Sequence, residues 1–437
     1  MLALAAMLST VTVARATPPP IAWCGSDESQ ADRLPDAVSS YQIHVIYSYP
    51  SDGPDRFGSL AGPIASAINA ISVWWTGQDP TRSPRFDLFD FPGCATTLGR
   101  LDLTSAKLPH DSSYFAPEIS RGGRLAADIV SLGFVEIHKK YIVLYDGPIE
   151  GRVCGVSPVL AFSGGIDAYS EIFLQGPCLA GDLGSVLSTS PVLAHELVHN
   201  LGALVAGPGP PNACPGDPGH PCDSAYDLMY PFDLGIPLDQ KVLDVGHDDY
   251  YGHSGAWFDV QDSTWLAHLD APQYPLTVSI GGSPGGGTVT SGLPGISCPP
   301  ACSIAWDSGT LVELTAQPSG NAHFAGWSGA CAGSDPACSV TVSSAQAVSA
   351  RFEVPIQLTV KVVGRGGKGL VTSKPAGIRC PGACSAKFDQ GSAVVLTASA
   401  RRGSLFSGWR GACGRRPSCT IALGAARTVQ AVFVRKR

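Results

Sequence analysis

The stretch His195-Glu196-Leu197-Val198-His199-Asn200-Leu201-Gly202 has the HExxH spacing by which one helix holds a zinc ion. Two histidines four residues apart leave the same face of an α-helix, so both imidazoles can reach one metal ion at about 2.0–2.1 Å. Glu196 lies one position further round the helix, where it can reach a water on the open coordination position of that ion. The stretch therefore predicts a helix from about residue 191 to Leu201, with His195 and His199 as zinc ligands and Glu196 as the general base.

A catalytic zinc also needs a third protein ligand, and the sequence after the motif limits the choice. There is no glutamate from Leu197 to Val312, and the Gly-Pro-rich residues 207–211 do not favour a second helix, which excludes a site of the His₂Glu class. His220 is the preferred third ligand and Asp223 is its alternative, because imidazole and carboxylate both serve zinc. Less favoured candidates are Asp217, Asp227, His247 and His253.

The motif and the sequence after it resemble the metzincin pattern HExxHxxGxxH, in which the glycine turns the chain and a third histidine follows. Gly202 matches that glycine, but the position of the third histidine holds Val205, which cannot bind metal. Further on, Asp227-Leu228-Met229-Tyr230 resembles the metzincin Met-turn. The resemblance implies a zinc peptidase in which the connection from Gly202 to the third ligand is lengthened and tied by a disulfide. It also implies that Met229 lies beneath the metal. The alternative is that Met229 only fills the core.

The cysteines indicate export. All 14 follow Ala16 and their number is even, as expected for disulfides formed in an oxidising compartment. The apolar run from Leu2 to Val13 ends in Ala14-Arg15-Ala16, so we expect residues 1–16 to be a signal peptide and the mature protein to be secreted, without a membrane span. Before residue 272 the predicted disulfides are Cys24–Cys94, Cys154–Cys178 and Cys214–Cys222. The alternative for Cys24 is a free thiolate that binds the zinc and inhibits the enzyme.

Residues 17–272 are predicted to form one α+β catalytic domain. Hydrophobic alternation predicts strands at 41–49, 85–91, 140–146 and 169–174, and helical spacing predicts helices at 61–75 and 124–132. This order of strands and helices, followed by the helix with the two histidines, is that of the N-terminal half of a zincin.

The last third of the chain repeats with a period near 82 residues, which predicts two modules at 273–354 and 355–437. The sequence Phe-Ala-Gly-Trp-Ser-Gly-Ala-Cys at 324–331 returns as Phe-Ser-Gly-Trp-Arg-Gly-Ala-Cys at 406–413, and alternating apolar residues make both copies all-β. The copies resemble divergent internalin-type B-repeats of exported bacterial surface proteins, a resemblance that implies spacing or weak adhesion. Four cysteines per copy favour two disulfides over a zinc site and leave three pairings open.

Charge is distributed unevenly. The net charge of −7 divides into −18 over residues 1–272, −3 over 273–354 and +14 over 355–437. We expect the last module to bind anionic cell-wall or surface polymers, with solubility as the alternative, and we do not expect nucleic acid as a partner, because no recognition helix is visible. Residues 244–251 are rich in oxygen ligands for Ca²⁺ but lack the EF-hand spacing, so a solvated turn is favoured there.

These patterns predict a secreted zinc endopeptidase, which hydrolyses the peptide bonds of protein or peptide substrates with a zinc-bound water activated by Glu196. The alternative is a cell-surface adhesin or wall-binding protein whose zincin domain is inactive or wall-specific. The intact Glu196 favours the enzyme, because structural zinc sites usually close with four protein ligands and need no such carboxylate.

Overall fold

The computed structural model describes residues 20–26, 30–157, 164–165, 168–204, 211–414 and 418–436. The predicted signal peptide and Val205 lie outside these residues. The chain divides into two compact units. The first comprises the described residues up to Gln273 with Leu293–Gly295 and Ile304–Ser308, and the second comprises the remainder.

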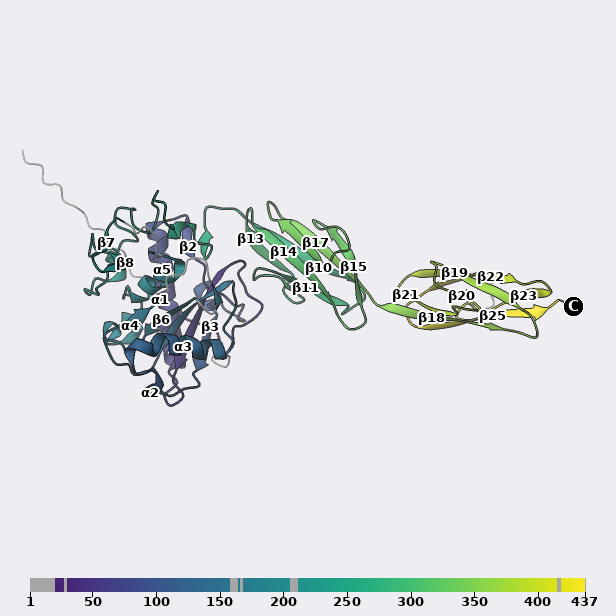
Figure 1. The fold of residues 1–437 in the computed structure, drawn as a ribbon, viewed down its shortest axis with the longest axis horizontal. Coiled ribbons are helices and arrows are strands. Elements are labelled where there is room, and N and C mark those ends of the chain that lie inside the picture. Colours follow the sequence, from purple (N-terminus) through teal and green to yellow (C-terminus); the bar gives the residue numbers. More distant parts are fainter. Residues whose placement is uncertain are drawn as a thin grey trace, which may run out of the picture. The chain divides into compact units, whose positions relative to one another are not determined.

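The N-terminal domain is built on a five-stranded sheet with the order β3-β1-β4-β6-β5 (Figure 1). The first four strands are parallel, and β5 pairs with β6 in the antiparallel direction at the edge of the sheet. The strands are β1 (Gln42–Tyr49), β3 (Leu103–Lys107), β4 (Lys139–Tyr145), β5 (Gly155–Val156) and β6 (Tyr169–Phe173). Three of the predicted strands therefore correspond to β1, β4 and β6.

Helices cover both faces of this sheet. Successive strand residues point to opposite sides, so neighbouring residues of one strand belong to two different cores. Ile43, Val45 and Ile142 share one core with α1 and α5, whereas Ile46 and Val143 share the other core with α3. The helices are α1 (Phe57–Gln78), α2 (Ser112–Phe115), α3 (Glu118–Ser131), α4 (Leu183–Val186) and α5 (Val192–Leu201). The predicted α+β class of this domain agrees with the structure.

Helix α1 is the one helix among the described residues that is long and apolar enough to cross a membrane by length and composition. Its residues Leu60, Ile64, Ile68 and Ile71 lie in the core against the sheet. Core packing accounts for the apolar character of this helix.

The prediction of a strand at 85–91 is wrong. The regular strand in this region is β2 (Arg82–Pro84), which pairs with β9 (Leu266–His268), while Phe86 and Leu88 form only isolated bridges to Ile43 and Leu101. Phe86 and Leu88 are nevertheless buried. Asp87 between them is fully buried as well, so the segment is enclosed on both sides without forming a regular hydrogen-bonded ladder.

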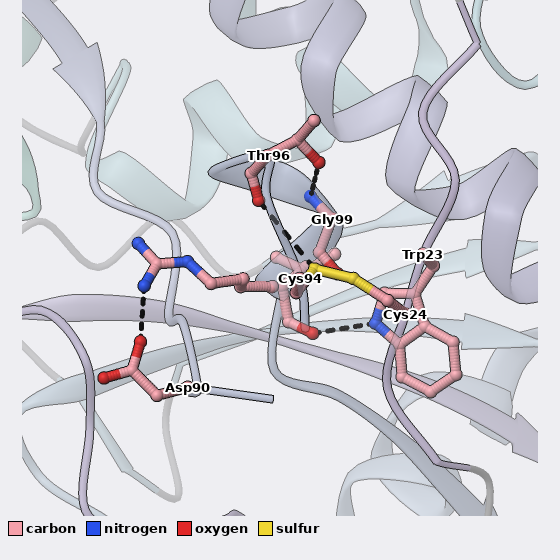
Figure 2. Close-up of a disulfide and its surroundings, with 8 residues drawn as sticks. Trp23, Cys24, Asp90, Cys94, Thr96 and Gly99 are labelled. Carbon is pink, nitrogen blue, oxygen red and sulfur yellow. Dashed lines mark hydrogen bonds and ion pairs between the residues drawn. A yellow bond between two sulfur atoms is a disulfide. The ribbon is translucent and has the colours of Figure 1, made fainter. Parts of the chain in front are cut away.

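Figure 2 shows the disulfide between Cys24 and Cys94, beside Trp23, whose indole nitrogen donates to the carbonyl oxygen of Leu101 at 2.9 Å. This pair was predicted, and it excludes the alternative in which a Cys24 thiolate caps the zinc. The predicted Cys214–Cys222 pair is also formed. Cys154 is disulfide-bonded, and the side chain of Cys178, its predicted partner, lies outside the described part of the structure.

Each C-terminal module consists of two four-stranded sheets that enclose one core. In module 1 the sheets have the orders β13-β10-β17-β15 and β12-β11-β14-β16. Its strands are β10 (Gln273–Gly282), β11 (Gly287–Ser291), β12 (Ser297–Cys298), β13 (Ser303–Asp307), β14 (Leu311–Pro318), β15 (His323–Gly329), β16 (Ala337–Thr341) and β17 (Gln346–Glu353). The first and last strands, β10 and β17, are parallel neighbours.

Module 2 repeats this arrangement with the orders β21-β18-β25-β23 and β20-β19-β22-β24. Its strands are β18 (Pro355–Val363), β19 (Gly369–Lys374), β20 (Arg379–Cys380), β21 (Ser385–Asp389), β22 (Ala393–Ala400), β23 (Ser404–Gly411), β24 (Cys419–Ala422) and β25 (Arg427–Arg435). Trp409 and Phe433 are among the buried residues of its core. Both modules are all-β, as predicted.

The cysteines of each module pair consecutively along the chain. The bonds are Cys298–Cys302, Cys331–Cys338, Cys380–Cys384 and Cys413–Cys419, with Cα atoms 4.4 to 6.2 Å apart. The alternative of a zinc site in each module is therefore wrong. Consecutive pairing follows from the fold, because each pair spans one short turn, whereas any other pairing would have to join separate turns.

Candidate metal centre

Helix α5 carries the HExxH motif and is fastened to the sheet by polar contacts as well as by its apolar face. Asn200 donates its amide hydrogens to the carbonyl oxygens of Tyr141 and Ala168, at 3.3 and 3.2 Å. The hydroxyl of Ser170 donates to the carbonyl oxygen of Glu196 at 3.1 Å. The helix ends at Gly202, whose φ of 110° is the left-handed conformation that glycine adopts without strain. These contacts fix the direction in which the motif side chains leave the helix.

The structure brings His195, His199 and His220 together, and we call these three residues the histidine site. Nε2 of His220 lies 3.2 Å from Nε2 of His199 and 3.3 Å from Nε2 of His195. Three imidazoles that bind one tetrahedral zinc at 2.0–2.1 Å would hold their nitrogens about 3.3–3.4 Å apart. The three side chains therefore have the chemistry and the spacing that zinc requires.

His195 is held in the tautomer that a metal ligand needs. Its Nδ1–H donates to the carbonyl oxygen of Leu228 at 2.9 Å, which leaves the lone pair on Nε2. Burial, together with the positive charges that His220 and Lys241 can carry, lowers the pKa of His195 to about 4. Burial also holds the pKa of His199 well below its ordinary value. Both imidazoles are neutral at pH 7, the state in which histidine binds metals.

His220 reaches the helix from a hairpin formed by β7 (Ala213–Cys214) and β8 (Asp217–Pro221). The disulfide Cys214–Cys222 closes this hairpin. The carboxylate of Asp217 lies 2.9 Å from Nδ1 of His220. The candidate third ligand is therefore positioned by a covalent loop and by a neighbouring charge.

Glu196 lies beside this site and is only 7% exposed. Burial raises the pKa of Glu196 to about 7, so the carboxyl group exchanges protons near neutrality. The backbone of Gly155 in β5 passes so close that a Cβ atom there would come within 2.5 Å of Cγ of Glu196. Glycine at this position is thus required by the approach of the edge strand to the candidate base.

The remaining site residues of the sequence analysis lie in two places. Met229 is fully buried in the core to which α5 also contributes, and its backbone N–H donates to the Asp227 carboxylate at 2.7 Å. Asp223, the alternative third ligand, lies instead in a group with Asp248 and Asp249, whose carboxylates come within 4.8 Å of one another. The backbone N–H of Asp249 donates to the buried carboxylate of Asp244 at 3.2 Å, within the turn of residues 244–251. Calcium binding by this turn stays a prediction.

A cavity of about 880 Å³ opens over the histidine site. Its lining includes Gly155 and Val156 of the edge strand β5, and Tyr230 and Phe232 of the segment after Met229. Phe232 is 63% exposed, and Val153 and Val156 are also exposed at the rim. The cavity therefore offers a strand edge and apolar side chains next to the candidate metal and base.

The sequence analysis missed a second group of metal-ligating side chains. Asp32, His44, Asp87 and Asp102 bring their ligand atoms within 4.8 Å of one another. Two cations are already bound among them, since Lys139 Nζ lies 2.6 Å from Asp87 and 2.8 Å from Asp32, and an Arg33 guanidinium nitrogen lies 2.6 Å from Asp102. We call these residues, with Asp36, the ionic cluster.

Burial and neighbouring charges shift the pKa values of groups in the ionic cluster. Burial alone would lower the pKa of His44, but Asp32, Asp87 and Asp102 raise it above its ordinary value. Burial and the charge of Asp87 raise the pKa of Asp36 to about 8. Positive charge for these carboxyl groups therefore comes from Lys139, Arg33 and His44 of the chain itself.

Comparison with known protein families identifies the two modules. Residues 276–355 and 360–437 match the family described as the divergent InlB B-repeat domain, as the resemblance implied. These segments make up less than half of the chain, so they do not classify the N-terminal domain. The disulfides and the repeat modules fit an extracellular protein. No curated protein sequence matches the chain significantly.

Solved structures give only weak likenesses. Archaemetzincin from Methanopyrus kandleri is 13% identical, with 46% of this chain and 87% of that chain covered and a TM-score of 0.25. Metalloproteinase-II from Bacteroides fragilis is 16% identical over 48% of this chain and 51% of that chain, with a TM-score of 0.27. Catalytically inactive OgpA from Akkermansia muciniphila, in complex with an O-glycopeptide, is 9% identical over 92% and 95%, with a TM-score of 0.29. These scores are too low to carry an argument about fold or activity.

Proposed function

We propose that the N-terminal domain is a zinc-dependent peptidase of the zincin type that acts outside the cell. The observation that carries this proposal is the convergence of the Nε2 atoms of His195, His199 and His220 beside the buried carboxylate of Glu196. A structural zinc site usually takes four protein ligands, whereas three ligands beside an open cavity are typical of a catalytic site. His220 is the proposed third ligand, since Asp223 lies in another group.

Bound zinc would supply a Lewis acid and would lower the pKa of a coordinated water towards about 7. The residues of the chain carry the proton transfers. Glu196, with its pKa raised to about 7 by burial, accepts a proton from the attacking water. The same carboxyl group then donates that proton to the nitrogen of the leaving amine. The carbonyl oxygen of Leu228 keeps His195 in the ligating tautomer during both steps.

The edge strand β5 supports a peptide as the substrate. Within the described part of the chain it is the last strand of the sheet, next to β6, and it lines the cavity beside Glu196. A free strand edge offers backbone donors and acceptors to an extended peptide, and the exposed side chains of Val156 and Phe232 offer apolar contacts to its side chains. The proposed substrate is therefore an extended segment of a protein or peptide.

The test is cleavage of unfolded casein by the zinc-loaded full chain, compared with Glu196→Gln. We expect Glu196→Gln to retain stoichiometric zinc and to lose about 10²–10⁴-fold in kcat/KM, because the amide cannot move a proton. A chelator should abolish cleavage by the wild type, and added zinc should restore it. A folded, zinc-loaded wild type without cleavage, or an unimpaired Glu196→Gln enzyme, would contradict the proposal.

A further inference from the structure

The positive charge of module 2 is gathered at one end of the fold. The turn between β18 and β19 carries Arg365 and Lys368, the turn between β22 and β23 carries Arg401 and Arg402, and the end of β25 carries Arg435 and Lys436. All six side chains are exposed. We call these six residues the cationic tip; Figure 1 shows β23 and β25 reaching this end of the module.

Backbone hydrogen bonds join the three segments of the tip. The N–H of Arg401 donates to the carbonyl oxygen of Lys368 at 2.9 Å, that of Arg435 to Arg365 at 3.3 Å and that of Lys436 to Gly403 at 2.9 Å. These hydrogen bonds bring the three segments alongside one another, and charges on neighbouring segments are screened only over a Debye length of about 8 Å at physiological salt. The six charges therefore act on a ligand together.

Acidic side chains of module 2 do not neutralise the tip. Asp389 is the only acidic residue between 355 and 437. It pairs with Pro355 at the start of β18, whereas the tip follows Val363 at the end of that strand. At about 3.3 Å per residue the separation is about 26 Å, so the charge of Asp389 is screened at the tip.

Module 1 shows that the fold does not need these charges. It has the same strand order and the same hydrogen bond at this place, from the N–H of Ser319 to the carbonyl oxygen of Gly286 at 2.8 Å. The residues of module 1 that correspond to Arg365, Lys368, Arg401 and Arg402 are uncharged: Ser283, Gly286, Ser319 and Gly320. Clustered cations repel one another, so a group that the fold does not require indicates a ligand of opposite charge.

We infer that the cationic tip binds a linear polyanion that carries phosphate groups on a flexible chain without bases. Exposed pairs with single anions contribute little in water, whereas a polymer engages several cations at once and releases its counterions. Single-stranded nucleic acid fits less well, because its bases stack on exposed aromatic side chains in proteins that bind it. The four aromatic residues of module 2 belong to or pack against its core: Phe388, Phe406, Trp409 and Phe433.

The experiment measures the affinity of the full chain for labelled poly(glycerol phosphate) by fluorescence anisotropy over a series of salt concentrations. The tip variant replaces Arg365, Lys368, Arg401 and Arg402 with serine. The matched body variant replaces four exposed cations elsewhere in module 2 with serine: Lys361, Lys374, Arg379 and Lys387. Both variants have the same net charge, and thermal melting confirms that both are folded.

We expect the tip variant to bind at least about tenfold more weakly, and the slope of log K against log salt to decrease in magnitude by about 3, because four phosphate contacts are lost. The body variant should stay within about threefold of the wild type. Equal losses in both variants would show that only net charge matters, and absence of wild-type binding would refute the site. Tighter binding to duplex DNA, or to vesicles of phosphatidylglycerol, than to the polymer would overturn the assigned ligand.

Discussion

The histidine site and the ionic cluster both gather side chains that bind metals, and they differ in what neutralises them. In the ionic cluster the ammonium group of Lys139 lies 2.6–2.9 Å from three carboxyl groups, so the cation is part of the chain. In the histidine site three imidazoles face one another, and burial keeps His195 and His199 neutral. Both groups thus bring their ligand atoms close together. Of the two, the ionic cluster contains its own cation, whereas the histidine site consists of imidazoles that can bind a metal ion.

Removal of the resident cation should have the largest effect. We expect Lys139→Met to lower the free energy of unfolding by about 3–5 kcal/mol, because it leaves buried carboxylates without their partner. Urea denaturation of the zinc-loaded protein measures this loss. Adding Asp87→Asn to Lys139→Met should recover part of it. Unchanged stability of the single variant would mean that the carboxylates take up protons without cost, and the contrast between the two groups would fail.

Removal of one imidazole of the histidine site should weaken zinc binding and leave the fold intact. We expect His220→Ala to weaken zinc binding by at least about 100-fold, since even changes to groups that only orient a ligand cost about 10–100-fold. Asp223→Ala is the matched control and should leave the affinity unchanged, because Asp223 lies in another group. Competition with a chromogenic chelator gives both constants. The opposite ranking of these two variants would make Asp223 the third ligand.

Acidification should have a smaller effect on the free energy of unfolding, through the ionic cluster. Burial alone would raise the pKa of Asp87, but Lys139 and His44 lower it to about 2. A carboxylate with a lowered pKa contributes stability that is fully present above its unfolded value, near pH 3.9, and is lost as the pH falls towards 2. We expect this window to account for about 2 kcal/mol.

Urea denaturation at several values between about pH 5 and pH 2 follows that loss. Asp87→Asn should show a shallower dependence on pH in this window. The double variant His195→Asn, His199→Asn should lose stability less steeply than the wild type on acidification below about pH 6.5, because it lacks two imidazoles whose pKa values burial lowers in the folded protein. An Asp87→Asn variant that keeps the wild-type dependence between about pH 4 and pH 2 would contradict the assignment of this loss to Asp87.

The sequence predicted the histidine site better than it predicted the ionic cluster. His195, Glu196 and His199 are close in sequence, and the helix that holds them follows from local periodicity. His220 was found by a short inventory of ligands within a loop. Zinc binding at the histidine site stays a proposal.

The ionic cluster depends on contacts that no local pattern contains. Lys139 is 107 residues from Asp32 and 103 from Asp36 along the chain. The sequence analysis began the strand of this region at residue 140 and gave Lys139 no role. A lysine at the start of a strand is usually exposed, so its burial becomes visible only when β1 and β4 are placed side by side.

The pairing of the first and last strands in each repeat has a mechanical consequence. In module 1, β10 and β17 are parallel neighbours from Leu276 and Gln346 to Gly282 and Phe352, and β18 and β25 repeat this in module 2. Tension applied through the two ends of a module pulls these strands along their length in opposite directions. All the hydrogen bonds between them are then loaded in shear and must break together. A tether made of such modules resists stretching until the whole pair ruptures.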